Sequence, residues 1–250
     1  MPSPAVARDL NTAYQFMRAR FGYQAWWPAD TPFEVCVGAI LTQNTSWRNV
    51  ERAIANLKAA NLLSAGALQT TPEWELEGLL RPAGYFRVKC GRLKSFVAVL
   101  AGEFGGDLRQ LFAGTTAEVR SRLLSINGVG PETADSMLLY AGGHLSFVVD
   151  AYTKRVFARH GWCQADADYH ELQRLCSSCL IQKPRSQQLE YWQDYHAQLV
   201  MVGKRFCSNR KPLCLECPLK PLLPEAGPQE LSVKRRRSPA LSAAKDYGPA

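Results

Sequence analysis

Apolar residues recur with the period of an α-helix along most of the first 160 residues. Residues 8–21 form one such segment, and the apolar segment 32–43 begins with Pro32, which suits a first helical turn. The same period, with polar opposite faces, predicts further helices at residues 49–60, 73–80, 89–104, 116–124 and 151–160. Only residues 145–149 resemble a strand, and they are too short to build a sheet. The pattern therefore predicts an all-α protein.

Composition and charge narrow the functional classes. The chain has 250 residues, of which 46% are hydrophobic, so it can bury one core or two lobes that share one. No segment approaches the roughly 18–20 apolar residues of a membrane helix, and the N-terminus lacks the apolar run of a signal peptide. We therefore expect a cytoplasmic protein without a membrane partner, whose eight cysteines are reduced or metal-bound.

A net charge of +8 favours a polyanionic partner such as DNA or RNA. Part of this charge lies in residues 226–250, which include a Lys/Arg run and small polar residues. We predict that this tail is disordered. It is as compatible with a solvated end as with a DNA-binding arm.

The most informative motif is a Gly-Val-Gly turn at residues 128–130, followed by Pro131 at a predicted helix start. Glycine permits a tight turn, and the amides of Gly128, Val129 and Gly130 are candidates for binding a phosphate regardless of base sequence. Many connections between helices contain such a turn, so the motif alone is a weak signal. Asp150 begins the next predicted helix, where aspartate is commonly only an N-cap.

The segments 126–135 and 148–153, together with residues 40–45, 84–89 and the cysteines near 207–217, resemble the endonuclease III superfamily of helix–hairpin–helix DNA glycosylases. Within it, the chain is most similar to the 3-methyladenine glycosylase III branch. The resemblance implies a six-helix lobe at about residues 32–145 and a second lobe from residues 1–31 plus 146–225. It also implies a monomer that holds double-stranded DNA with a damaged base across the cleft between the lobes.

The resemblance places Asp150 beside the sugar of an extruded nucleotide. Cleavage of an N-glycosidic bond builds positive charge on the sugar, so this carboxylate would stabilise the transition state or activate the attacking water. Bifunctional members carry a Schiff-base lysine shortly after the hairpin, but Glu132 stands in that place here. A carboxylate cannot form an imine, which implies a monofunctional hydrolase. Glu132 would contact the base or water, or only complement the helix dipole.

Aromatic residues gather in the segments that the resemblance assigns to the DNA face. Trp26, Trp27 and Trp47 are candidates for the base pocket, because flat side chains hold flipped bases and attract the positive charge of alkylated purines. Core packing is the alternative for each tryptophan.

Three further residues are candidates for DNA contact. The resemblance implies that Gln43 and Tyr85 fill the gap left by the flipped nucleotide, although Gln43 could equally be a helix cap. Lys89 would touch phosphate, or lie on a solvated helix face.

The spacing Cys207-x6-Cys214-x2-Cys217 is typical of a metal site, and the resemblance implies a [4Fe–4S] cluster. The fourth cysteine of the family pattern is replaced by Leu223. Another side chain or solvent would have to complete the cluster, or the loop packs without metal. We expect the cluster.

Other functions remain open at this point. One is a glycosylase of the same fold that acts on oxidised, deaminated or mismatched bases, with weak lyase activity at abasic sites. A second is a non-catalytic helix–hairpin–helix module that only binds DNA. A third, an iron–sulfur redox protein or sensor, is disfavoured by the missing cysteine.

Overall fold

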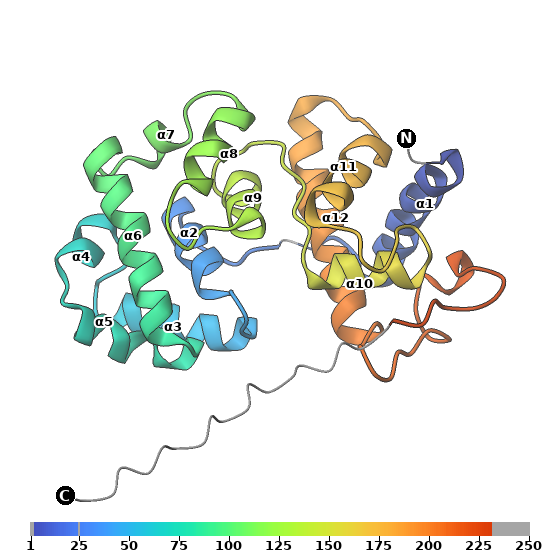
Figure 1. The fold of residues 1–250 in the computed structure, drawn as a ribbon, viewed down its shortest axis with the longest axis horizontal. Helices are drawn as coiled ribbons and strands as arrows, with labels where there is room; N and C mark the ends of the chain where they lie inside the picture. The colour runs from blue at the N-terminus through green and yellow to red at the C-terminus, as the bar shows by residue number, and fades with distance from the viewer. Residues whose placement is uncertain (1–2, 25, 232–250) are drawn as a thin grey trace, which may run out of the picture.

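The computed structural model describes residues 3–24 and 26–231, and these contain helices and loops but no strand (Figure 1). The predicted all-α class is confirmed. The α-helices are α1 (Pro4–Phe21), α2 (Pro32–Leu41), α3 (Trp47–Ala59), α4 (Ala65–Thr70), α5 (Glu73–Leu80), α6 (Phe86–Phe104), α7 (Leu108–Leu111), α8 (Thr116–Leu124), α9 (Pro131–Tyr140), α10 (Ala151–Arg159), α11 (Tyr169–Cys179) and α12 (Arg185–Arg205). Short 3₁₀ helices span Arg81–Ala83 and Lys220–Leu222. None of the helices in the described ranges is long and apolar enough to cross a membrane.

The helices enclose two hydrophobic cores. The first is built by α2 to α9 and extends along the chain from Cys36 to Leu138. The second is built by α1 and by the chain from Leu139 to Leu219, which includes α10, α11 and α12. In Figure 1 the two groups lie side by side, and α9 lies between them in contact with α2, α8 and α12.

A buried carboxylate joins the two lobes. Asp135 of α9 is fully buried, and its oxygens accept hydrogen bonds from Arg120 at 2.8 and 3.0 Å. The hydroxyls of Ser146 and Tyr169 and the amide of Gln173 also donate to it. A buried charge is tolerated only when it is paired and fully hydrogen-bonded, so this network fixes α8, α9 and α11 relative to one another.

The predicted tail is only partly described. In its described part, residues 226–231, the N–H of Gln229 donates to the carbonyl of Arg159 at the end of α10, at 2.9 Å. The Lys/Arg run of the tail lies outside the described residues.

Candidate active site

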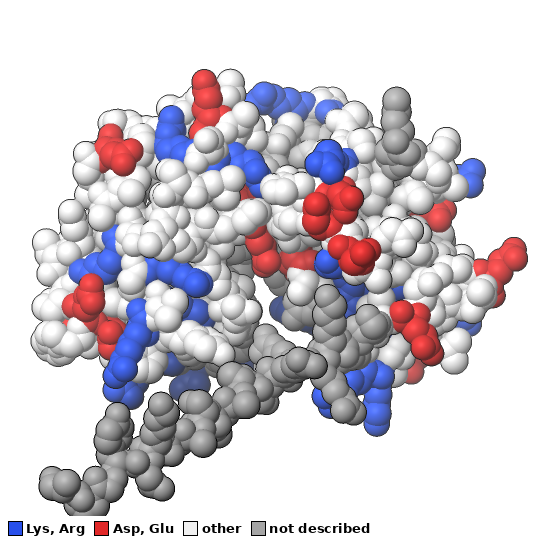
Figure 2. All heavy atoms as spheres, in the orientation of Figure 1, with Lys and Arg blue, Asp and Glu red and all other residues white. Residues whose placement is uncertain are grey.

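A cleft runs between the two lobes and contains about 1890 Å³ of unfilled space, part of it open to solvent. Figure 2 shows the surface hollowed between the lobes, with Lys and Arg side chains gathered beside the hollow on the lobe of α3 and α6. Six of the predicted site residues line this cleft: Trp26, Trp27, Gln43, Trp47, Glu132 and Asp150. The structure thus brings together residues that are far apart in the sequence.

Asp150 caps α10 and also faces the cleft. Its Oδ1 accepts a hydrogen bond from the N–H of Thr153 at 2.7 Å, and its Oδ2 lies 3.7 Å from Nε2 of His196. Burial raises the pKa of the Asp150 carboxyl, but interaction with His196 and the hydrogen bonds of Thr153 outweigh burial and hold it below its usual value. Capping therefore occupies one oxygen and leaves an ionised carboxylate for chemistry.

His196 is a site residue that sequence reasoning missed. It lies on α12, is 5% exposed, and its Nδ1 is 2.7 Å from the hydroxyl of Tyr140. Its Nε2 lies too far from Asp150 for a direct hydrogen bond and has no other partner among the described residues. His196 follows no motif, and only the folded chain shows that it faces Asp150.

Glu132 lies in the first turn of α9 and shares the cleft with Asp150. Its side chain is exposed to the solvent in the cleft, and the cleft walls around it partly desolvate the carboxyl. This desolvation, together with the negative charge of Asp150, raises the pKa of Glu132 to about 7, and His196 opposes the shift. The two carboxyls therefore have pKa values shifted in opposite directions, as is typical of a site where two carboxyls have different tasks.

The Gly-Val-Gly hairpin requires glycine at its first position. Gly128 has φ +86°, and a Cβ there would lie 2.2 Å from Cγ of Arg92. Gly130 is the N-cap of α9. The side chain of Val129 is buried, and its N–H donates to the carbonyl of Ile126 at 3.0 Å, so this amide is committed to the turn. The structure therefore differs from the prediction that the amide of Val129 binds a phosphate.

Gln43 braces this hairpin. Its Nε2 donates to the carbonyl of Gly128 and to Oγ1 of Thr133, both at 2.9 Å, and its Oε1 accepts from Arg92. Both ends of the amide are thus engaged in holding the hairpin against α2. Filling a gap in DNA would require the side chain to leave these partners.

The three tryptophans have different surroundings. Trp27 and Trp47 meet edge to face at 5.5 Å and pack against the first core, and Trp27 lies 5.0 Å from the ring of Tyr140. Trp26 packs less deeply, and the ammonium of Lys204 lies 5.2 Å from its ring centre. One face of this ring is therefore already in contact with a cation of the protein.

Two predicted DNA contacts lie away from the cleft wall. Tyr85 is 70% exposed and has φ +46° just before α6, a conformation that costs energy for a non-glycine residue. Lys89 is 1% exposed, and its ammonium donates to the carbonyls of Leu41 and Ala83 at 2.8 and 2.7 Å. Both predictions for Lys89, a phosphate contact and a solvated helix face, are therefore wrong, because its ammonium is buried and donates to two backbone carbonyls.

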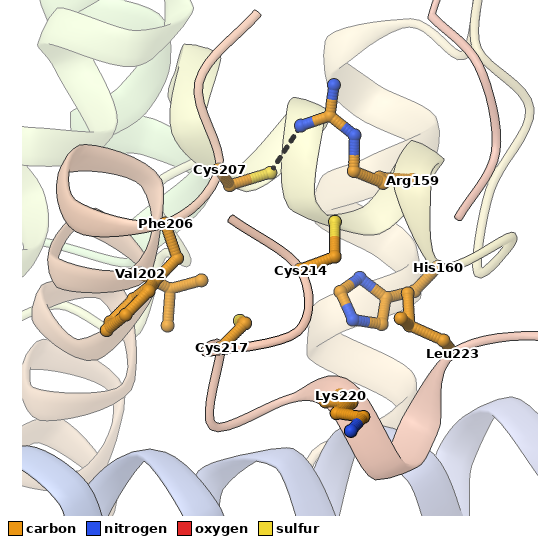
Figure 3. Close-up of a pocket in the computed structure, with 9 residues that line it drawn as sticks. All are labelled: Arg159, His160, Val202, Phe206, Cys207, Cys214, Cys217, Lys220 and Leu223. Atoms are coloured by element: carbon orange, nitrogen blue, oxygen red, sulfur yellow. Dashed lines mark hydrogen bonds between the residues drawn. The ribbon is translucent and has the colours of Figure 1, made fainter. Parts of the chain in front are cut away.

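A second, smaller pocket contains the predicted metal ligands. Cys207, Cys214 and Cys217 line it together with His160 and Leu223 (Figure 3). All three thiols are free. Among the residues in the described ranges, no three His, Cys, Asp or Glu side chains are grouped so as to hold a single metal ion. A [4Fe–4S] cluster separates its ligands more widely, because each binds a different iron.

Comparison with known proteins identifies the family. Residues 37–180 match the HhH-GPD superfamily of base excision DNA repair proteins. The chain is 46% identical over 208 residues, which are 83% of this chain and 92% of the relative, to "Putative DNA repair glycosylase MJ1434" of Methanocaldococcus jannaschii. The chain belongs to the HhH-GPD superfamily and is a base excision repair DNA glycosylase.

Solved structures agree with this fold. A non-covalent endonuclease III–DNA complex superposes with a TM-score of 0.73 at 22% identity, covering 88% of this chain and 95% of the other. The 3-methyladenine DNA glycosylase of H. pylori bound to 1,N6-ethenoadenine superposes with a TM-score of 0.66 at 24% identity, covering 80% and 97%. At these identities the likeness establishes the fold, while the substrate must be argued from the site.

Proposed function

We propose that this protein is a monofunctional glycosylase that hydrolyses the N-glycosidic bond of an alkylated purine, such as 3-methyladenine, in double-stranded DNA. The observation that carries the proposal is the single cleft that combines Asp150, Glu132 and three tryptophans. Asp150 remains ionised beside the sugar and stabilises its developing positive charge. Phosphate contacts outside the cleft supply most of the affinity for DNA.

The substrate preference is inferred from the aromatic rings and carboxylates of the cleft, whose lining also contains the cations of Arg48 and Lys204. A purine alkylated at N3 or N7 carries positive charge, which suits both aromatic rings and the carboxylate of Glu132. Such a base also leaves readily, so its release needs no covalent nucleophile.

A panel of duplexes that each carry one lesion tests this proposal. We expect release of 3-methyladenine and 7-methylguanine, and little release of 8-oxoguanine, uracil or mismatched thymine. Preferential release of a neutral oxidised or deaminated base would overturn the substrate assignment. Tight binding without release of any base would favour a non-catalytic binding module.

The absence of a lyase step is proposed from the hairpin. Glu132 replaces the lysine there, but one amine, that of Lys204, does lie among the residues that line the cleft. It supports the second candidate, a bifunctional enzyme for oxidised bases with weak lyase activity. Borohydride should trap no covalent protein–DNA complex. A trapped complex that disappears in Lys204→Ala would establish the second candidate.

The loop at residues 207–223 is proposed to hold a [4Fe–4S] cluster through Cys207, Cys214 and Cys217. When bound, the cluster would tie this loop to the end of α10, because its ligands line one pocket there. No step of base release depends on it.

A further inference from the structure

The cysteine pocket lacks a thiolate at its fourth position but contains another donor. Leu223 stands where the family pattern has cysteine, and its side chain offers no ligand atom. His160, which follows the last residue of α10, lines the same pocket. Figure 3 shows its ring between Cys214 and Lys220, next to Leu223.

The ring of His160 is held with one nitrogen free. Its Nδ1 lies 2.8 Å from the carbonyl of Val156, and since a carbonyl only accepts, Nδ1 carries the hydrogen. The ring also stacks on Trp162 with a centroid distance of 4.5 Å. His160 is 6% exposed, and its Nε2 is buried and makes no hydrogen bond of good geometry among the described residues, although the backbone of Leu219 lies near the ring. A buried nitrogen with a free lone pair is costly unless something binds it.

A buried cation in the same cysteine pocket, Arg159, indicates that the pocket suits a negatively charged group. Arg159 is 4% exposed and donates to Sγ of Cys207 at 3.0 Å and to the carbonyl of Ser208 at 2.9 Å. It forms no ion pair with a carboxylate within the described ranges. Burying a guanidinium against a neutral thiol is unfavourable, whereas a thiolate bound to iron provides the missing negative charge.

We propose that Nε2 of His160 is the fourth ligand of the [4Fe–4S] cluster, replacing the cysteine lost at Leu223. The inference rests on the proposed cluster and is independent of the proposed glycosylase activity. The lone pair of Nε2 binds one iron while Nδ1 keeps its proton, so ligation by histidine releases no proton. Imidazole is a suitable ligand for iron. Because it is neutral, the cluster is one charge less negative than a four-thiolate cluster and is reduced more easily.

Iron spectroscopy on the full chain, prepared without oxygen and enriched in ⁵⁷Fe, tests the proposal. We expect about one iron in four to have a distinct Mössbauer isomer shift, because one of the four irons has a nitrogen ligand. Pulsed electron paramagnetic resonance of the reduced cluster should detect a directly bound nitrogen, and labelling histidine with ¹⁵N should change that signal.

Variants distinguish ligation by His160 from ligation by solvent or by another side chain. His160→Cys should keep the iron but lose both the distinct iron and the nitrogen signal, because it supplies a fourth thiolate. His160→Ala should lose the nitrogen signal and about half or more of the iron. His170→Ala, at an exposed histidine of α11, is the matched control and should change neither.

Several results would overturn the proposal. A cluster with four equivalent irons, or one whose spectrum is the same in His160→Ala, would exclude His160 as a ligand. Wild-type protein that is folded but contains no iron would overturn it together with the cluster. The lesion panel would then still decide the glycosylase assignment, because that assay does not depend on iron.

Discussion

The two ends of α10 form two different kinds of site. At its N-terminus, Asp150 faces a wide cleft between the lobes, and at its C-terminus Arg159 and His160 face a small pocket lined by cysteines. Each charge suits its end, because the helix dipole stabilises a carboxylate at the start and a cation at the finish. On the proposed function, this one short helix would serve both base release and attachment of the loop, and the two roles should be separable by mutation.

The largest expected effect is that of Asp150→Asn on base release. Asparagine can still cap α10, but it cannot stabilise positive charge on the sugar, so turnover should fall by about 10³-fold or more. Binding to duplex DNA, measured by fluorescence anisotropy, and iron content should stay near wild type. Asp168→Asn, which changes the N-cap of α11 in the same way, is the matched control and should remain active. An active Asp150→Asn enzyme would remove Asp150 from catalysis.

The next effect is that of Trp26→Ala on excision of methylated purines. Loss of stacking should weaken binding of the base by roughly 1–3 kcal/mol, the range for a base on an aromatic ring, and kcat/KM should fall accordingly. Trp26 is chosen because Trp27 and Trp47 pack against the first core, where truncation would also lower stability. Trp74→Ala is the control, since that residue is 75% exposed and does not line the cleft. Normal excision by Trp26→Ala would exclude its ring from the base pocket.

At the other end of α10, Cys214→Ser should lower iron content and stability but not chemistry. A fall in the melting temperature of about 2–8 °C is expected if the loop contributes about 1–2 kcal/mol. Cys163→Ser removes a thiol that does not line the pocket and should leave the iron unchanged. Excision per folded molecule should match wild type in both variants. Unchanged iron and melting temperature in Cys214→Ser would indicate a metal-free loop.

Some helices can be predicted from the sequence with accurate bounds, and others cannot. Helices at residues 73–80 and 116–124 were predicted with the bounds that the structure has, because a regular apolar period marks them in the sequence. The first helix begins four residues earlier than the predicted residue 8, at Pro4, where Ser3 caps it. Three helices (α4, α7 and α12) were not predicted, since α4 and α7 are short and the apolar residues of α12 surround it on several sides.

Site residues were predictable where a motif carries them. Asp150 and Glu132 follow from the hairpin and its neighbourhood, whereas His196 has no motif and depends on the packing of α12. The burial of Lys89 did leave a signal in the sequence. Lys89 precedes Leu93 and Phe96 on one helical face, so the period alone places it inward. What the period cannot show is the pair of carbonyls that accept its hydrogen bonds, because they come from other elements.

The smallest expected effect is the dependence of excision on Glu132 and pH. Because the pKa of Glu132 is raised to about 7, its side chain is largely neutral at pH 6 and largely ionised at pH 8. A cationic base is held better by the ionised form, so kcat/KM for a methylated purine should rise by up to about 10-fold over this range, and Glu132→Gln should abolish the rise.

The raised pKa of Glu132 also has a consequence for the stability of the protein. A carboxyl whose pKa is raised by folding stabilises the protein at low pH and loses that contribution as pH rises through 7. Glu132→Gln should therefore raise the melting temperature at pH 8 and leave it nearly unchanged at pH 5.

The opposite pH dependence of excision would change the role of Glu132. An excision rate that falls as pH rises in the wild type, and not in Glu132→Gln, would mean that the neutral acid is the active form. Protonation of a neutral leaving base would then replace binding of a cationic one as the task of Glu132.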